Sequence, residues 1–188
     1  MSTRVERGRT LARSQALQLL FQAEALDKDL DQVINGEYLL SKGPLEPYAV
    51  VLARGCYDNI ERIDEALMSV STNWRLDRMP GTDRNILRIA VYEMLMLPEA
   101  AKLDVPIVIS EAVNLAKAYG TDESARFING VLGRIARDPA LVPSYAPEVA
   151  APEAGQDDSE PVPTESALSA SSVPSGESAN DGEDAAHA

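Results

Sequence analysis

The sequence predicts an all-α domain, a compact bundle of about six or seven helices, followed by a disordered acidic tail. Three observations predict it. Through residues 1–137, apolar side chains recur at spacings of three and four, the period of one helix face. No segment there shows the strict alternation of a half-buried strand. Residues 138–188 contain 7 of the 12 prolines and neither Phe nor Trp, so they cannot form a core.

The first predicted helix runs from about Thr10 to Leu26. Its inner face is expected to consist of small and aliphatic residues, namely Ala12, Ala16, Leu19, Leu20 and Ala23. A shorter helix is expected after Asp29, where Leu30, Val33 and Ile34 are apolar. The Gly43-Pro44 pair ends that segment.

The most regular run predicts one long helix of about six turns, starting near Pro47, a residue suited to a first helical turn. Its apolar stripe is Ala49, Leu52, Cys56, Ile60, Ile63 and Leu67. The stretch 69–79, which contains Trp74, is ambiguous, and a short helical turn fits there.

Pro80-Gly81 precedes a helix expected from about Asp83 to Leu97. Its inward residues are Ile86, Leu87, Ala90, Val91 and Met94. Asp104 is a candidate cap for the next helix, which starts near Pro106 and ends before Gly120. This helix is expected to bury Ile109, Ala112, Val113 and Ala116.

Thr121 is expected to cap the last helix, with Asp122 and Glu123 in its first turn. The predicted inner face is Phe127, Val131, Leu132 and Ile135. Gly130 and Gly133 weaken a helix, and close approach to a neighbouring helix is the expected reason. Pro139 and Pro143 follow, so the helical domain is expected to occupy residues 1–137 and the tail residues 138–188.

Charge is distributed unevenly along the chain, whose formal net charge is −13. All 17 Lys and Arg lie in residues 1–137, together with 19 acidic residues, whereas residues 138–188 contain 11 acidic residues and no base. The acidity therefore belongs mostly to the tail. It does not exclude a nucleic-acid partner for the domain.

Nothing in the sequence predicts an enzyme, a metal or a cofactor. Cys56 is the one cysteine, and it lies on an apolar helix stripe; the one histidine, His187, is next to last in the tail. Neither a Cys/His cluster for zinc nor a glycine-rich phosphate loop occurs. No apolar stretch is long enough for a membrane span or a signal peptide, and the expected location is the cytoplasm.

Four blocks in the second half of the domain are specific in combination. They are Asp83–Glu93 (DRNILRIAVYE), Asp104-Val105-Pro106, Glu111–Lys117 (EAVNLAK) and Phe127–Leu132 (FINGVL). In order and spacing they resemble the NusB family, and the arginine-rich start leading into Gln15-Ala16-Leu17 is similar as well. The resemblance covers about residues 4–137.

The resemblance implies a helical RNA-binding factor that pairs with ribosomal protein S10 (NusE). The pair recognises boxA, a single-stranded RNA element of nascent ribosomal RNA leaders. It helps an antitermination complex on RNA polymerase to resist premature termination. Family members occur as monomers and as homodimers, and the sequence does not decide between them. A helical protein–protein adaptor or homodimer of the same fold with little RNA binding is the alternative.

A basic arm, residues 1–13, is the first candidate RNA site. Its arginines, Arg4, Arg7, Arg9 and Arg13, suit phosphate contacts and stacking on bases. From composition alone, a solvated N-terminus that leads into a helix explains them as well. The resemblance implies that they contact RNA, although Glu6 and Gly8 dilute the arm relative to the family pattern.

The start of the last helix is the second candidate RNA site. The resemblance implies RNA contacts by Glu123, Arg126 and Phe127; a carboxylate can accept from a base amino group. Dipole stabilisation by Glu123 and a core position for Phe127 are the alternatives. Gln18, opposite Leu19 and Leu20, is a further RNA candidate. The resemblance also implies S10 binding by Asp83, for which a helix N-terminal acid is the alternative.

Overall fold

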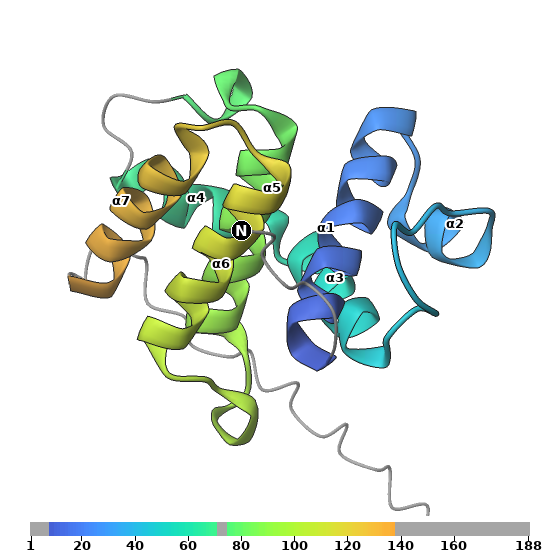
Figure 1. Ribbon diagram of the computed structural model, residues 1–188, viewed down its shortest axis with the longest axis horizontal. Helices are drawn as coiled ribbons and strands as arrows, with labels where there is room; N and C mark the ends of the chain where they lie inside the picture. Colours follow the sequence, from blue (N-terminus) through green and yellow to red (C-terminus); the bar gives the residue numbers. More distant parts are fainter. Residues whose placement is uncertain (1–7, 71–74, 138–188) are drawn as a thin grey trace, which may run out of the picture. The chain divides into compact units, whose positions relative to one another are not determined.

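The computed structural model describes residues 8–70 and 75–137, which form a bundle of helices (Figure 1). Among these residues there are seven α-helices and no strand, so the predicted all-α class is confirmed. In chain order the helices are α1 (Gly8–Leu26), α2 (Leu30–Asn35), α3 (Pro47–Asp58), α4 (Ile60–Val70), α5 (Gly81–Val91), α6 (Val105–Tyr119) and α7 (Ser124–Arg137). The predicted tail, the first seven residues of the arm and Trp74 lie outside the described residues.

Helix α5 lies at the centre of the bundle, where it packs against α1, α3, α4, α6 and α7. Its buried aliphatic residues are Ile86, Leu87, Ile89, Ala90 and Val91. Helices α1 and α3 pack against each other on one side of it, and α6 and α7 on the other (Figure 1).

The prediction of one long helix after Pro47 is wrong in one respect, because the structure has two helices there, which meet at Asn59. Asn59 leaves the helical conformation (φ −114°, ψ 19°), and its Nδ2 donates to the Gly55 carbonyl at 2.9 Å. Such a side-chain bond competes with the backbone ladder. Ile60 at the break is only half-buried. The rest of the predicted stripe is buried: Ala49, Leu52, Cys56, Ile63 and Leu67.

The helix predicted from Asp83 begins two residues earlier, and at Tyr92 it widens into a π-helical turn, η2 (Tyr92–Met96). Its predicted inward residues are all buried. The ring of Tyr92 lies against α3 at Gly55, where an added Cβ would be 2.0 Å from the Tyr92 Cζ. Glycine is therefore required at position 55 for this close approach. A 3-10 turn, η1 (Leu76–Arg78), fits the short turn expected within 69–79, and another, η3 (Glu99–Ala101), leads toward α6.

In α6 the buried face is rotated from the predicted one. Asp104 occupies the N-cap position, although its side chain makes no capping hydrogen bond. Ile109 and Val113 are only half-buried, and Val108 and Leu115 fill the core instead. The other two predicted residues, Ala112 and Ala116, are buried, so the error is one of about a quarter turn within the same helix.

Helix α7 starts at Ser124, later than a cap at Thr121 would place it. The Thr121 N–H donates to Ser124 Oγ at 2.9 Å, so these two residues close a turn ahead of the helix. The predicted core position of Phe127 is also corrected. Phe127 is half-buried and Ile128 is fully buried, whereas Val131, Leu132 and Ile135 are buried as predicted.

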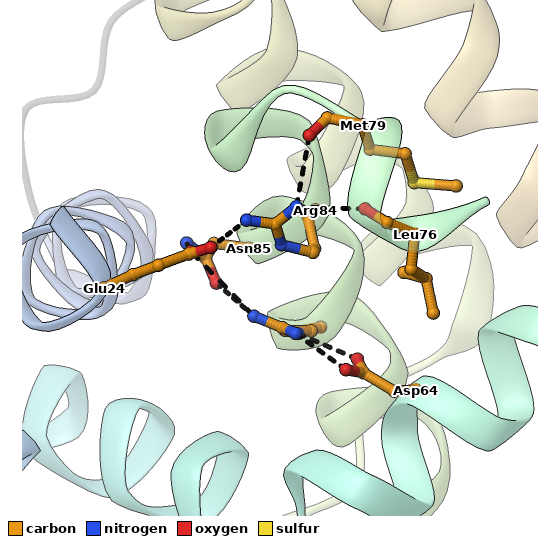
Figure 2. Close-up of polar contacts among 7 residues, drawn as sticks. Glu24, Asp64, Leu76, Met79, Arg84 and Asn85 are labelled. Atoms are coloured by element: carbon orange, nitrogen blue, oxygen red, sulfur yellow. Dashed lines mark hydrogen bonds and ion pairs between the residues drawn. The ribbon is translucent and has the colours of Figure 1, made fainter. Parts of the chain in front are cut away.

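A polar clamp joins α1, α4 and α5 (Figure 2). The Glu24 carboxylate of α1 accepts from Arg84, and from Asn85 Nδ2 at 3.0 Å. Arg88 donates twice to Asp64 of α4, at 2.8 and 2.7 Å. Arg84 also donates to the carbonyls of Leu76 and Met79, which fixes η1 against α5. The two cations on this face of α5 are therefore used to hold the helices together.

Candidate nucleic-acid interface

The arm arginines within the described residues, Arg9 and Arg13, have opposite surroundings. Arg9 is exposed near the start of α1, whereas Arg13 is 3% exposed, one turn further along. Arg4 and Arg7 lie outside the described residues.

Arg13 sits in a buried ionic network that joins α1, α3, η2 and α6. Its guanidinium donates to both carboxylate oxygens of Glu93, at 2.7 and 2.9 Å, and to Glu111 at 3.1 Å. Tyr48 Oη donates to Glu93 at 2.9 Å, and Thr10 Oγ1 donates to Glu111 at 2.6 Å. This bidentate geometry is the strong form of an arginine–carboxylate pair.

The network explains why Arg13 stays charged inside the protein. Burial by itself lowers the pKa of Arg13, but hydrogen bonding to Glu93 and the charges of Glu93 and Glu111 raise it overall. Arg13 is only 3% exposed and its guanidinium is bound to Glu93 and Glu111, so an RNA contact by Arg13 stays a prediction. In the structure Arg13 anchors the base of the arm to two other helical segments, η2 and α6.

Arg9 lies above a ring that this network holds in place. Its guanidinium carbon is 5.0 Å from the centroid of Tyr48, a cation–π contact. Burial, and then the charge and hydrogen bond of Glu93, raise the pKa of the Tyr48 hydroxyl well above its ordinary value, so the phenol remains neutral. An exposed guanidinium stacked on a fixed aromatic ring is a surface that an RNA base or phosphate can approach. Tyr48 was not among the sequence candidates.

Gln18 is half-buried, and its amide is occupied by the protein itself. Nε2 donates to the carbonyl and the hydroxyl of Ser14 at 3.0 and 3.1 Å, and Oε1 accepts from the Ser41 N–H at 2.7 Å. Gln15 binds the same α2–α3 connection at Lys42, Pro44 and Glu46. The structure therefore gives Gln18 a loop-anchoring role, and an RNA contact by it stays a prediction.

Asp83 is buried at the junction of α5 and α7, only 5% exposed. Its Oδ2 accepts from Ser124 Oγ at 2.9 Å, and its Oδ1 has no partner among the described residues. The bond to Ser124 fixes the start of α7 against α5. Asp83 therefore lies largely beneath the surface, and a direct contact of its carboxylate with S10 stays a prediction.

A groove of about 750 Å³ runs along α7 and contains the other predicted residues of this helix. Glu123, Arg126 and Phe127 all line it, together with Asp83 from α5. The structure therefore brings together the residues predicted at the helix start. Further along α7 the groove is lined by residues that were not predicted to contact RNA, namely Gly130, Val131, Arg134 and Arg137. The helical spacing of Arg134 and Arg137 from Arg126 is the sequence feature that could have identified the basic part of this groove.

The two glycines of α7 do not have the packing role expected for them. A Cβ added at Gly130 would meet nothing within 4 Å, and one at Gly133 would meet only Arg137 Nη1 at 3.5 Å. Close helix approach is therefore wrong as their explanation. A glycine in a helix interior costs about 1 kcal/mol relative to alanine, and here no neighbouring helix requires it.

A hydrogen bond links α1 to the end of α6. Ser14 and Tyr119 share a hydrogen bond of 2.5 Å between their hydroxyls, which ties α1 to the last residue of α6. Thr121, at the head of the α7 groove, is two residues further on. This bond therefore links the helix that carries the arm to the connection that leads into α7.

Metal ligands and the cysteine were the remaining candidates for chemistry. No group of three or more His, Cys, Asp or Glu side chains within them is placed to hold a metal ion. Burial raises the pKa of the Cys56 thiol well above its ordinary value, as expected for a structural cysteine. In the same part of the chain, no helix is long and apolar enough to cross a membrane.

These features define the class of protein: an all-α domain with seven α-helices among the described residues and a cluster of arginines at its N-terminus. The chain belongs to the NusB family, whose model matches residues 10–137. The transcription antitermination protein NusB of Salinispora arenicola is 44% identical over 131 residues, which cover 68% of this chain and 94% of that protein. The NusB protein of Anaeromyxobacter dehalogenans is 42% identical over 134 residues, covering 68% and 89%.

Solved structures show the same fold. T. maritima NusB superposes with a TM-score of 0.60 at 33% identity, covering 71% of this chain and 93% of that one. A chain from a crystal structure of the antitermination factors NusB and NusE in complex with double-stranded RNA matches with a TM-score of 0.54 at 24% identity. That match covers 69% of this chain and 96% of the other, and at this identity it supports the fold alone.

Proposed function

We propose that this chain is a transcription antitermination factor. It binds the boxA element of nascent ribosomal RNA leaders together with ribosomal protein S10 (NusE), and the pair helps the RNA polymerase complex to resist premature termination. The observation that carries the proposal is the 44% identity to an antitermination protein over 94% of its length. The exposed Arg9, stacked on Tyr48, supports an RNA contact at the arm. Such a factor acts by binding and not by catalysis, in the cytoplasm where transcripts are made.

A second candidate function is that of a helical protein–protein adaptor or homodimer with little RNA binding. The observation that favours it is the burial of Arg13, which removes one of the four arm arginines from the surface. The two functions differ in their response to RNA sequence. An adaptor without RNA recognition has no preference between boxA and another RNA of the same composition.

The full-length protein is expected to bind a labelled single-stranded boxA RNA weakly alone and more tightly when S10 is present. The physical reason is that S10 adds contacts to a complex in which the protein's own cationic surface is small. Fluorescence polarisation against a scrambled RNA of the same composition measures the preference. Equal affinities for the two RNAs in the presence of S10 would contradict the proposed function and favour the adaptor.

The S10 surface is proposed on the exposed neighbours of Asp83, because that carboxylate is itself buried. A hollow of about 320 Å³ lies between α1 and the start of α5, lined mostly by apolar side chains. Phe21 and Leu39 there are 46% and 82% exposed, and Thr82 adjoins Asp83 in the chain. Exposed aromatic and aliphatic side chains around a hollow are typical of a protein-binding surface.

Phe21→Ala is expected to reduce S10 affinity by about tenfold or more, as truncation of an aromatic anchor does. It should leave RNA binding by the protein alone unchanged, since Phe21 belongs neither to the arm nor to the lining of the α7 groove. Val51→Ala is a matched control, because Val51 is a similarly exposed apolar residue (49%) on α3. Titration of labelled S10 measures both variants. An unchanged S10 affinity for Phe21→Ala would place the S10 surface elsewhere.

A further inference from the structure

Helix α7 presents a basic stripe that runs beyond the residues predicted to contact RNA. Arg126, Gly130, Arg134 and Arg137 are spaced by four, four and three residues, so they lie along one face of the helix. All four line the groove of about 750 Å³. From Arg126 to Arg137 the stripe is about 16 Å long at the rise of an α-helix. Three guanidinium groups thus follow one another along an open channel.

Within the described part of the chain, the arginines of this stripe form no ion pair that would stabilise the fold. Arg13, Arg84 and Arg88 each hold carboxylates of other helices. In contrast, no carboxylate among the described residues lies within ion-pair distance of Arg126, Arg134 or Arg137. Of the described residues that line the groove, two are acidic: Glu123 at its head is exposed, and Asp83 is buried. The channel therefore has an excess of positive charge.

The glycine at position 130 independently indicates that a ligand approaches this face of α7. It lies between Arg126 and Arg134 on the groove wall, and no atom of the described residues lies within 4 Å of the position of its missing Cβ. Packing therefore does not explain a residue that weakens the helix. A glycine is favoured where a ligand must come close to the backbone. Bare helix backbone flanked by guanidinium groups one turn before and one turn after fits the sugar–phosphate chain of a nucleic acid.

We propose that the α7 stripe is a second RNA-binding track, on which the sugar–phosphate backbone of single-stranded RNA lies across Gly130 and its phosphates contact Arg126, Arg134 and Arg137. The track begins beside Phe127 and is joined to the base of the arm through the Ser14–Tyr119 bond. It extends the RNA path along the whole of α7. This inference rests on the proposed RNA-binding function and adds the contact surface. Because phosphate contacts carry no sequence information, the track contributes affinity and not boxA preference.

Gly130→Leu separates this role from a structural one. The new side chain has room within the fold, and leucine is a better helix former than glycine, so Tm should rise by roughly 4 °C. At the same time the side chain occupies the track, and RNA affinity should fall by the same factor for boxA and for scrambled RNA. Asn129→Leu is the matched control, since Asn129 is exposed on α7 and does not line the groove. It should bind RNA as the wild type does.

The charge contribution is tested with Arg126→Gln/Arg134→Gln in the full-length protein. Loss of two phosphate contacts should make the negative slope of log affinity against log salt shallower by about 1.4 for a single strand. Arg54→Gln/Arg62→Gln removes the same charge from α3 and α4 and should leave that slope unchanged. Failure of the wild type to prefer boxA would overturn the proposed function. A wild type that prefers boxA, together with wild-type affinity in both α7 variants, would overturn the track alone.

Discussion

Replacement of Arg13 by methionine is expected to lower the free energy of unfolding by about 3–5 kcal/mol, the usual cost of breaking a buried ion pair from one side. The substitution keeps most of the side-chain volume but leaves Glu93, 1% exposed, as a buried charge without its bidentate partner. Glu111 also loses a donor. Urea denaturation followed by circular dichroism at the helix band measures the change.

Two further variants show whether the loss comes from the unpaired charge. In Arg13→Met/Glu93→Met both buried charges are removed, and most of the stability should return, because an apolar pair of similar volume often replaces a buried ion pair without loss. Arg54→Met breaks an exposed pair with Asp31 and should cost only about 0–1 kcal/mol. A loss of similar size for Arg13→Met and Arg54→Met would show that the buried network contributes little.

The network also marks where sequence reasoning reached its limit. Periodicity predicted the existence of α1 and its apolar face, because both depend on neighbours three and four residues apart. It could not show that Arg13 turns inward, since its carboxylate partners are 80 and 98 residues away in the chain. An arginine in an N-terminal cluster of arginines has the pattern of an RNA contact, and only the long-range packing of η2 and α6 on α1 distinguishes it from Arg9.

Other differences arise from local competition. At Asn59, a side-chain hydrogen bond to the Gly55 carbonyl divides a stripe whose apolar spacing continues across the break. In α7 the helix was predicted correctly, but its face is turned so that Ile128 is buried in place of Phe127. This small rotation has a functional consequence, because it brings Phe127 to the wall of the groove with Arg126. The grouping of the α7 residues was predictable from the family resemblance, whereas the groove required the packing of α5 against α7.

Loss of the exposed arm cations is the change expected to affect RNA binding most. In Arg4→Gln/Arg7→Gln/Arg9→Gln, the affinity for boxA RNA should fall by about a hundredfold, and the slope of log affinity against log salt by about 2, if each arginine neutralises one phosphate of a single strand. Arg9 is the arm residue whose surroundings are described: Tyr48 holds it in place at a cation–π energy of about 0.5–1 kcal/mol, so less entropy is lost when RNA binds.

The charge-matched control is Arg54→Gln/Arg62→Gln/Arg75→Gln, which removes three arginines outside the arm and the α7 groove. If long-range attraction to the whole protein drove binding, both triple variants would lose affinity equally, because a chain with a net charge of −13 becomes more negative by the same amount in each. Contact binding predicts a loss in the arm variant alone. Polarisation titrations over a salt series distinguish the two, and an arm variant that binds boxA like its control would leave the arm without an RNA-binding role.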